Sequence, residues 1–161
     1  MALVDLSHKP SGLLKWMLRL PTYLYRARLG CLLGDRFVMV EHRGRVSGTR
    51  YFTVIEVAGR SRTEWICASG TGPGADWYRN VRAGGLLALW VRSRRHGARV
   101  RFLSEEEAAD VMGAYERAHP RTAERLYEMM GTSYDGTDSG RVDMMKRMPM
   151  VAFAHYGRPP S

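Results

Sequence analysis

"RFVMVEHRGRVSGTRYFTVIEVAG", residues 36–59, joins two β-rich segments through a turn that contains two glycines. Segments of valine, phenylalanine and similar residues that are separated by a short link with glycine predict a β-hairpin. The turn is unusually basic, because Arg43, Arg45 and Arg50 surround Gly44 and Gly48. This hairpin is the starting point for predicting the fold, and its basic turn needs a functional explanation.

Four further segments predict strands. "EWICAS", residues 64–69, follows a polar turn, and "PMVAFAHYG", residues 149–157, is expected to form the last strand. Between them, "LLALWVR" (86–92) and "GARVRFLS" (97–104) predict a second hairpin. In the second of these, apolar residues alternate with arginines, which is typical of a strand with one face in water. The short links favour antiparallel pairing.

Helices are expected mainly in the C-terminal half. Ser104 and Glu107 have the spacing of a capping box, which predicts a helix that begins there and ends at Pro120. Pro120 is expected to open another helix, and shorter helices are expected over residues 76–82 and 141–148. The prediction is an α+β fold, with about six mostly antiparallel strands forming a small barrel and three or four helices around it.

The composition is that of a globular protein. The chain has 161 residues, of which 45% are hydrophobic and 25% charged, enough for one domain with a core. Its two cysteines, Cys31 and Cys67, show no metal-ligand spacing, so we expect no metal and a reduced, cytoplasmic environment. The net charge of +9 suits an anionic partner such as nucleic acid, a membrane surface or a phosphorylated ligand.

The N-terminal segment, residues 1–30, is expected to contain one or two short helices, broken or restarted at Pro21. Its leucines and aromatic residues form an apolar face, and lysine and arginine form a basic face. We favour packing on the body of the domain, with peripheral membrane contact as the alternative. No apolar run is long enough to span a bilayer, and no signal peptide is expected.

Several well-known catalytic signatures are absent from the sequence. The glycine-rich turn lacks the lysine and spacing of a nucleotide P-loop and the strand–GxGxxG–helix order of a dinucleotide fold. No histidine pair has zinc spacing, and no GxSxG motif occurs. Hydrolytic or metal catalysis therefore has no visible set of residues.

Two glycine-rich loops remain as candidate ligand-binding segments. In residues 41–50, arginine side chains can fork onto phosphate or carboxylate oxygens, glycines allow backbone amides to approach an anion, and Ser47 adds a hydroxyl. In residues 68–80, "ASGTGPGADWYRN", Trp77 and Tyr78 offer flat surfaces. For the first loop alone, a solvated hairpin tip is the simpler interpretation. Together, the two loops favour a planar ligand with a charged tail.

The segments "HRGRVSGTR" (42–50), "ASGTGPGADWYRN" (68–80) and "LSEEEAADVMGAYERAHP" (103–120) resemble the deazaflavin-dependent nitroreductase family. The resemblance extends from about Leu20 to Tyr156. It implies a split β-barrel over residues 31–161, related to flavin-binding pyridoxamine-phosphate-oxidase-like proteins. It also implies coenzyme F-420, a 5-deazaflavin with a phosphate and a polyglutamate tail.

The resemblance also implies roles for individual residues. The turn of the family holds the phosphate and the anionic tail, which implicates Arg45, Ser47 and Gly48, with Arg43 and Arg50 as helpers. The second loop lies against the deazaflavin ring and its phosphoribityl arm, which implicates a set of five residues: Ala68, Ser69, Gly70, Asp76 and Trp77. The family often has basic residues at the positions of Val46 and near Tyr51, so contacts to the tail are expected to differ here.

The implied reaction is hydride transfer from reduced F-420 to a small organic acceptor such as a quinone, a nitroaromatic or an enone. Tyr127 and Tyr134 are proton-donor candidates by position, with packing as the favoured alternative for each. An FMN- or haem-binding barrel is a second hypothesis. A basic nucleic-acid-binding protein is a third, although no specific nucleic acid is expected. The sequence leaves a homodimer open.

Overall fold

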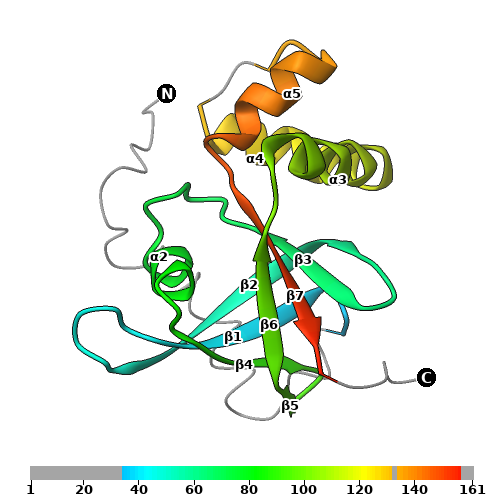
Figure 1. Ribbon diagram of the computed structural model, residues 1–161. Coiled ribbons are helices and arrows are strands. Elements are labelled where there is room, and N and C mark those ends of the chain that lie inside the picture. Colours follow the sequence, from blue (N-terminus) through cyan, green and yellow to red (C-terminus); the bar gives the residue numbers. More distant parts are fainter. Residues whose placement is uncertain (1–33, 132–133, 157–161) are drawn as a thin grey trace.

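The computed structural model describes residues 34–131 and 134–156 (Figure 1). The expected N-terminal helical segment, its membrane contact and Cys31 lie outside these residues. Seven strands form one antiparallel sheet in the order β5-β4-β1-β2-β3-β7-β6. Four helices are described in the same residues. The predicted α+β class and antiparallel pairing are confirmed.

The first hairpin forms as predicted. Strand β1 (Phe37–Arg43) pairs with β2 (Arg50–Arg60) in a register that places Arg43 directly opposite Arg50. The turn closes through a hydrogen bond from the Gly48 amide to the Gly44 carbonyl (2.9 Å). Gly48 has a φ of +69°, a conformation that glycine adopts without steric cost. The glycine in this turn is therefore needed for the backbone, whatever else it does.

The predicted second hairpin is wrong in its pairing. Strand β4 (Leu86–Val91) pairs with a short strand that the sequence did not reveal, β5 (Arg94–His96). The two residues between them, Arg92 and Ser93, have φ of 45° and 67°, as in a tight two-residue hairpin turn. Such turns usually contain asparagine or glycine, and an Arg-Ser pair gives no comparable signal. The extra strand raises the number from the expected six to seven.

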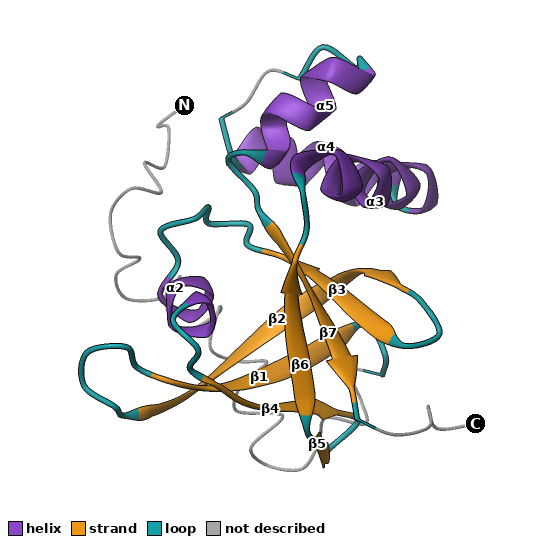
Figure 2. Ribbon diagram, in the orientation of Figure 1, coloured by secondary structure: helices purple, strands orange, loops and turns teal. Residues whose placement is uncertain are grey.

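The segment predicted as the partner of β4 is instead strand β6 (Ala98–Phe102), which pairs with the last strand, β7 (Met150–His155). Strands β5 and β6 are the two ends of the sheet and are separated in sequence by Gly97 alone. The sheet must therefore curl until its ends meet, and β6 also contacts β4. The result is a nearly closed barrel (Figure 2).

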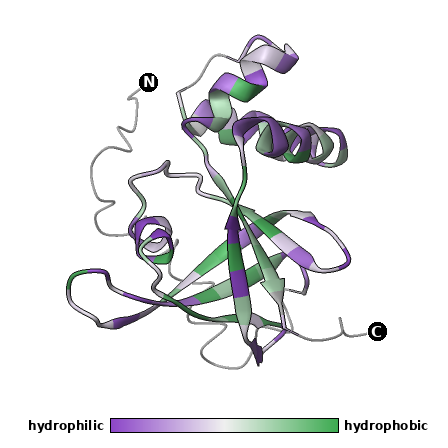
Figure 3. Ribbon diagram, in the orientation of Figure 1, coloured by the Kyte–Doolittle hydropathy of each residue, from purple (hydrophilic) through white to green (hydrophobic). Residues whose placement is uncertain are grey.

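The barrel encloses the first of two hydrophobic cores, and green, apolar segments lie along several of its strands in Figure 3. Strand β3 (Glu64–Ala68), between β2 and β7, contributes Trp65 and Cys67. Burial raises the pKa of the Cys67 thiol far above its usual value, so this cysteine is an apolar core residue. Helix α2 (Asp76–Arg82), predicted correctly, adds aromatic residues to the same core.

The second core lies between the outer side of the barrel and three helices that group at one end of it (Figure 2). Helix α3 (Glu105–Ala118) begins with the predicted capping box, and α4 (Pro120–Met129) has its proline in the first turn. Helix α5 (Asp138–Met145) begins three residues before the predicted start. Its N-cap, Thr137, accepts a hydrogen bond from the Gly140 amide (3.0 Å). Within the described residues, none of the helices has the length and apolar character needed to cross a membrane.

Candidate functional site

The basic turn is attached to helix α2 through Arg45. The backbone amide and the guanidinium of Arg45 both donate to the Asn80 side-chain oxygen, at 3.1 and 2.8 Å. The same guanidinium lies 3.3 Å from the Asp76 carboxylate. Two segments that the sequence marked as ligand loops are therefore held side by side by direct contacts.

The other side of the Asn80 amide contacts a buried histidine that sequence analysis did not select. Asn80 Nδ2 lies 3.2 Å from His42 Nδ1, and His42 Nε2 lies 3.1 Å from Thr53 Oγ1. An amide nitrogen only donates, so Nδ1 must be unprotonated and the ring proton resides on Nε2. Burial lowers the pKa of His42 to about 4, although the Asp76 carboxylate opposes this shift. His42 is therefore neutral at physiological pH.

Polar groups inside the turn mostly bond to one another. The Gly44 amide donates to the Thr49 carbonyl (2.8 Å), and the Gly48 amide to the Gly44 carbonyl. The Ser47 hydroxyl accepts from the Thr49 amide (3.2 Å) and keeps its own proton for a ligand. The two glycine amides that the sequence suggested as anion donors are thus occupied by the turn, and anion binding falls to the side chains.

The arginines at the base of the turn form a concentration of positive charge. Arg43 and Arg50 are cross-strand neighbours, and like charges directly opposite each other destabilise a hairpin. Arg50 lies 3.5 Å from the buried carboxylate of Glu41 and remains 64% exposed. In the described part of the chain, no hydrogen bond or ion pair engages the Arg43 side chain. The positive charge of this pair is therefore incompletely neutralised and can bind an external anion.

Glu41 is largely committed to other partners. It is 1% exposed and accepts hydrogen bonds from Trp90 Nε1 (2.8 Å) and Arg95 Nε (2.9 Å). Burial alone raises its pKa, but the bonds from Arg95 and Trp90 outweigh burial and hold the pKa below its usual value. Glu41 thus stays ionised, and its long contact with Arg50 neutralises that arginine only in part.

The second loop follows β3 and differs from its predicted form. Ser69 is fully buried and stabilises the loop: its amide donates to the Pro149 carbonyl (2.9 Å) and its hydroxyl to the Gly72 carbonyl (2.6 Å). Trp77 is also buried and packs edge-on against Tyr78, with ring centroids 5.8 Å apart. These aromatic rings, expected as flat ligand surfaces, belong to the barrel core. Among the predicted loop residues, Gly70 and Asp76 are exposed.

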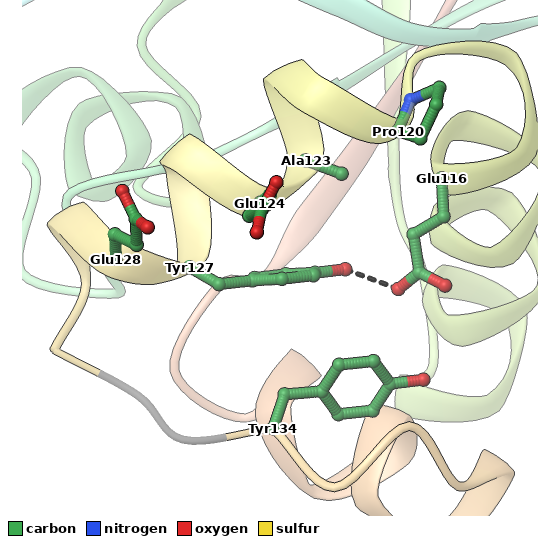
Figure 4. Close-up of a pocket in the computed structure, with 7 residues that line it drawn as sticks. All are labelled: Glu116, Pro120, Ala123, Glu124, Tyr127, Glu128 and Tyr134. Carbon is green, nitrogen blue, oxygen red and sulfur yellow. Dashed lines mark hydrogen bonds between the residues drawn. The ribbon is translucent and has the colours of Figure 1, made fainter.

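Tyr127 and Tyr134 line a cavity of about 420 Å³ on the helical side of the molecule (Figure 4). The Tyr127 hydroxyl donates to Glu116, which also accepts from Arg141 Nη2 (3.0 Å). The Tyr134 hydroxyl is buried and has no hydrogen-bond partner among the described residues. Burial raises the pKa of both tyrosines, and Glu116 adds to the shift. Both are therefore protonated at neutral pH, but only Tyr134 has an unengaged proton.

A smaller cavity, of about 150 Å³, lies between the barrel and helices α3 and α4, and Ala68 and Gly70 contribute to its wall. Two of the residues predicted to contact the ring of a cofactor thus adjoin this cavity. The described residues contain no cluster of three or more histidine, cysteine, aspartate or glutamate side chains that could hold a metal ion.

Two solved structures share the architecture of this chain. One is an F-420-H2 dependent reductase (FDR-A), 15% identical, with the match covering 74% of this chain and 95% of that one at a TM-score of 0.51. The other, described as a domain-swapped dimer, is 16% identical over 83% of this chain and 98% of that one, at a TM-score of 0.51. This chain has a split β-barrel fold.

The split β-barrel that the resemblance implied is thereby confirmed. No family model matches the sequence, and no curated protein matches it. Identities of 15% and 16% establish a common fold, and a fold hosts many activities. The function of this chain therefore depends on the residues of its own site.

Proposed function

We propose that this protein is an oxidoreductase that uses reduced coenzyme F-420 as hydride donor to a small organic acceptor such as a quinone, a nitroaromatic or an enone. The observation that carries the proposal is the cross-strand pair Arg43 and Arg50 beside a turn that Arg45 fixes to helix α2. Two guanidinium groups with incomplete neutralisation suit a ligand with several negative charges. A phosphate with a polyglutamate tail is such a ligand.

In this proposal the residues of the turn have two different roles, ligand binding and positioning of the turn. Arg43, Arg50 and the Ser47 hydroxyl hold the phosphate and the tail, while Arg45 positions the turn, since its guanidinium already contacts Asn80 and Asp76. The groups that would hold the cofactor are charged side chains on a turn that is hydrogen-bonded to helix α2. When bound, F-420 supplies the hydride. The protein orients it and excludes water from the acceptor.

Of the two tyrosine candidates for the proton that follows the hydride, Tyr134 is the stronger, because its hydroxyl proton has no partner in the described residues. It lines the cavity of about 420 Å³ and not the smaller cavity beside the second loop. Tyr127 is a weaker donor, because its proton is held by Glu116. We also propose a homodimer, since one structural neighbour is described as a domain-swapped dimer. Light scattering of the purified protein tests this assembly.

The function is tested by titrating the purified protein with F-420 while following the fluorescence of the cofactor. Binding in the micromolar range, followed by reduction of benzoquinone or nitrobenzene with reduced F-420, supports the proposal. No binding at micromolar F-420 contradicts it.

The other hypotheses give different outcomes. A yellow protein that retains FMN, or a haem spectrum, favours the alternative cofactors. FMN has a phosphate but no polyglutamate tail, so the charge surplus at Arg43 and Arg50 argues for F-420. Steeply salt-dependent binding to single-stranded DNA that persists with saturating F-420 favours a nucleic-acid-binding protein.

A further inference from the structure

The 150 Å³ cavity between barrel and helices has a mainly apolar wall. Strands β2 and β3 form one side, and helices α3 and α4 the other. Its apolar lining residues, apart from Gly70 at the surface, are Ile55, Ala58, Ala68, Met112, Leu126 and Met148. We call this cavity the apolar slot.

The polar contribution to the slot comes from one hydrogen-bonded pair. The Tyr115 hydroxyl donates to Glu56 Oε1 (3.0 Å), and Arg36 Nε donates to the same oxygen (3.1 Å). Both Tyr115 and Glu56 line the slot. A carboxylate in the wall disfavours an anionic ligand, since charge repulsion adds to the cost of desolvation. An uncharged ring is compatible with this wall.

Gly70 is the exposed residue of the lining and marks the mouth of the slot. Its missing side chain leaves the mouth open: a Cβ atom at this position would lie 3.9 Å from Leu126 Cδ1, an ordinary contact distance. The φ of Gly70 lies outside the left-handed region, so the backbone does not require glycine. A larger side chain at this position would close the mouth without backbone strain.

We propose that the apolar slot binds a single uncharged six-membered ring, and that this ring belongs to the hydride acceptor. The second part rests on the proposed function, since it needs the cofactor to lie at the neighbouring second loop. The size limit follows from the volume. An engineered apolar cavity of about 150 Å³ in another protein binds benzene. At the packing density of protein interiors a fused bicyclic ring needs more than that volume, so the slot favours monocyclic acceptors.

The slot is tested in the protein without cofactor, so that its failure is distinct from failure of F-420 binding. Toluene is titrated into protein labelled with ¹³C at the methionine methyl groups. Met112 and Met148 line the slot, whereas Met39, on strand β1, does not. Ring-current shifts confined to Met112 and Met148 are expected. Naphthalene and benzoate should bind at least about tenfold more weakly.

Gly70→Leu closes the mouth and should weaken toluene binding at least about tenfold. Gly74→Leu is the matched control. This glycine is exposed in the same loop, has a φ outside the left-handed region, and has open space where a Cβ atom would lie. Leu126→Ala should enlarge the slot and admit naphthalene. Three outcomes would overturn the proposal that the slot binds a ring. These are chemical shifts spread evenly over the methionines, equal binding of toluene and naphthalene, and equal effects of the two glycine variants.

A separate measurement tests whether the ring bound in the slot belongs to the hydride acceptor. With reduced F-420 saturating, Gly70→Leu should raise KM for nitrobenzene by more than it raises the dissociation constant of F-420. If toluene binds the slot but KM for nitrobenzene is unchanged in Gly70→Leu, the slot is not the acceptor site. Absence of F-420 turnover in the wild type contradicts the proposed function and leaves the toluene result intact.

Discussion

Arg45 and Asn80 are joined by two hydrogen bonds that converge on one atom: the Arg45 backbone amide and guanidinium both reach Asn80 Oδ1. The backbone bond fixes the path of the turn, and the side-chain bond fixes the guanidinium. Because the Asn80 nitrogen contacts His42, one amide links a surface turn to a buried ring. This linkage anchors the basic turn to helix α2 and to the buried end of strand β1.

Removal of the Asn80 side chain should destabilise the protein. Asn80→Ala leaves the buried His42 Nδ1 without its partner and frees both Arg45 donors, a loss of about 1–3 kcal/mol in the free energy of unfolding. Urea denaturation measures the change. Arg79→Ala, at the neighbouring exposed position of α2, should stay within about 0.5 kcal/mol of wild type. Equal effects of the two substitutions would contradict the linkage.

Stability should fall as the pH drops from about 6.5, the pKa of an unfolded histidine, towards 4. The folded pKa of His42 is lowered to about 4 by burial, so the unfolded chain binds a proton in this window that the folded chain does not. His42 should contribute a loss of up to about 3 kcal/mol by pH 4. The free energy of unfolding of wild type and of His42→Gln is measured as a function of pH. The difference between the two slopes gives the contribution of His42. Parallel slopes would show that His42 titrates normally.

Arg43→Gln should weaken F-420 binding about tenfold, as expected for loss of one charge-assisted hydrogen bond. Its stability should not fall, because the substitution removes repulsion from the opposite Arg50. Fluorescence titration and thermal unfolding give the two values. Arg62→Gln removes an exposed arginine beyond the end of β2 and controls for net charge. A similar loss of affinity in both variants would indicate a general electrostatic effect and no specific contact.

Arg45→Ala should differ from Arg43→Gln. Its guanidinium bonds Asn80 and lies against Asp76, so its removal should lower both cofactor affinity and the free energy of unfolding, the latter by about 1 kcal/mol or more. Parallel titration and urea denaturation of the two variants compare them. Unchanged stability of Arg45→Ala would mean that its contacts with α2 contribute nothing.

Tyr134→Phe should separate structure from catalysis. The buried Tyr134 hydroxyl has no partner in the described residues, so its loss should leave stability unchanged or raise it by about 1 kcal/mol. If Tyr134 is the proton donor, kcat should fall about a hundredfold at saturating F-420. Tyr127→Phe should show the reverse pattern, with lower stability and a smaller change in kcat. An unchanged kcat in Tyr134→Phe would assign that tyrosine to packing.

Local signals in the sequence were enough to predict most of the elements. The β1–β2 hairpin, the capping box at Ser104 and helix α2 all depend on residues close together in the chain. The β4–β5 hairpin was missed because its turn, Arg92 and Ser93, adopts positive φ without the glycine or asparagine that usually signals it. Strand pairing over a distance, such as that of β6 with β7, has no local signal.

The site was predicted as two loops but not as a network. The arginines and glycines of the turn are visible as a motif, whereas the role of Asn80 depends on packing α2 against the end of β1. Trp77 was expected at a ligand surface, yet helical periodicity places it in the barrel core. Exposure is decided by tertiary packing, which a short motif does not encode.

Gly97 has a consequence for the mechanical integrity of the barrel. It is the single residue between β5 and β6, so it carries the chain directly from one margin of the sheet to the other. A proteolytic cut or a long insertion at this point would release both margins at once, and unpaired margins recruit other chains. The same insertion between Arg43 and Arg50 would lengthen the turn and leave the barrel closed. The connection at Gly97 thus keeps the barrel closed. Insertions in this connection should be tolerated far less than the exposure of Gly97 suggests.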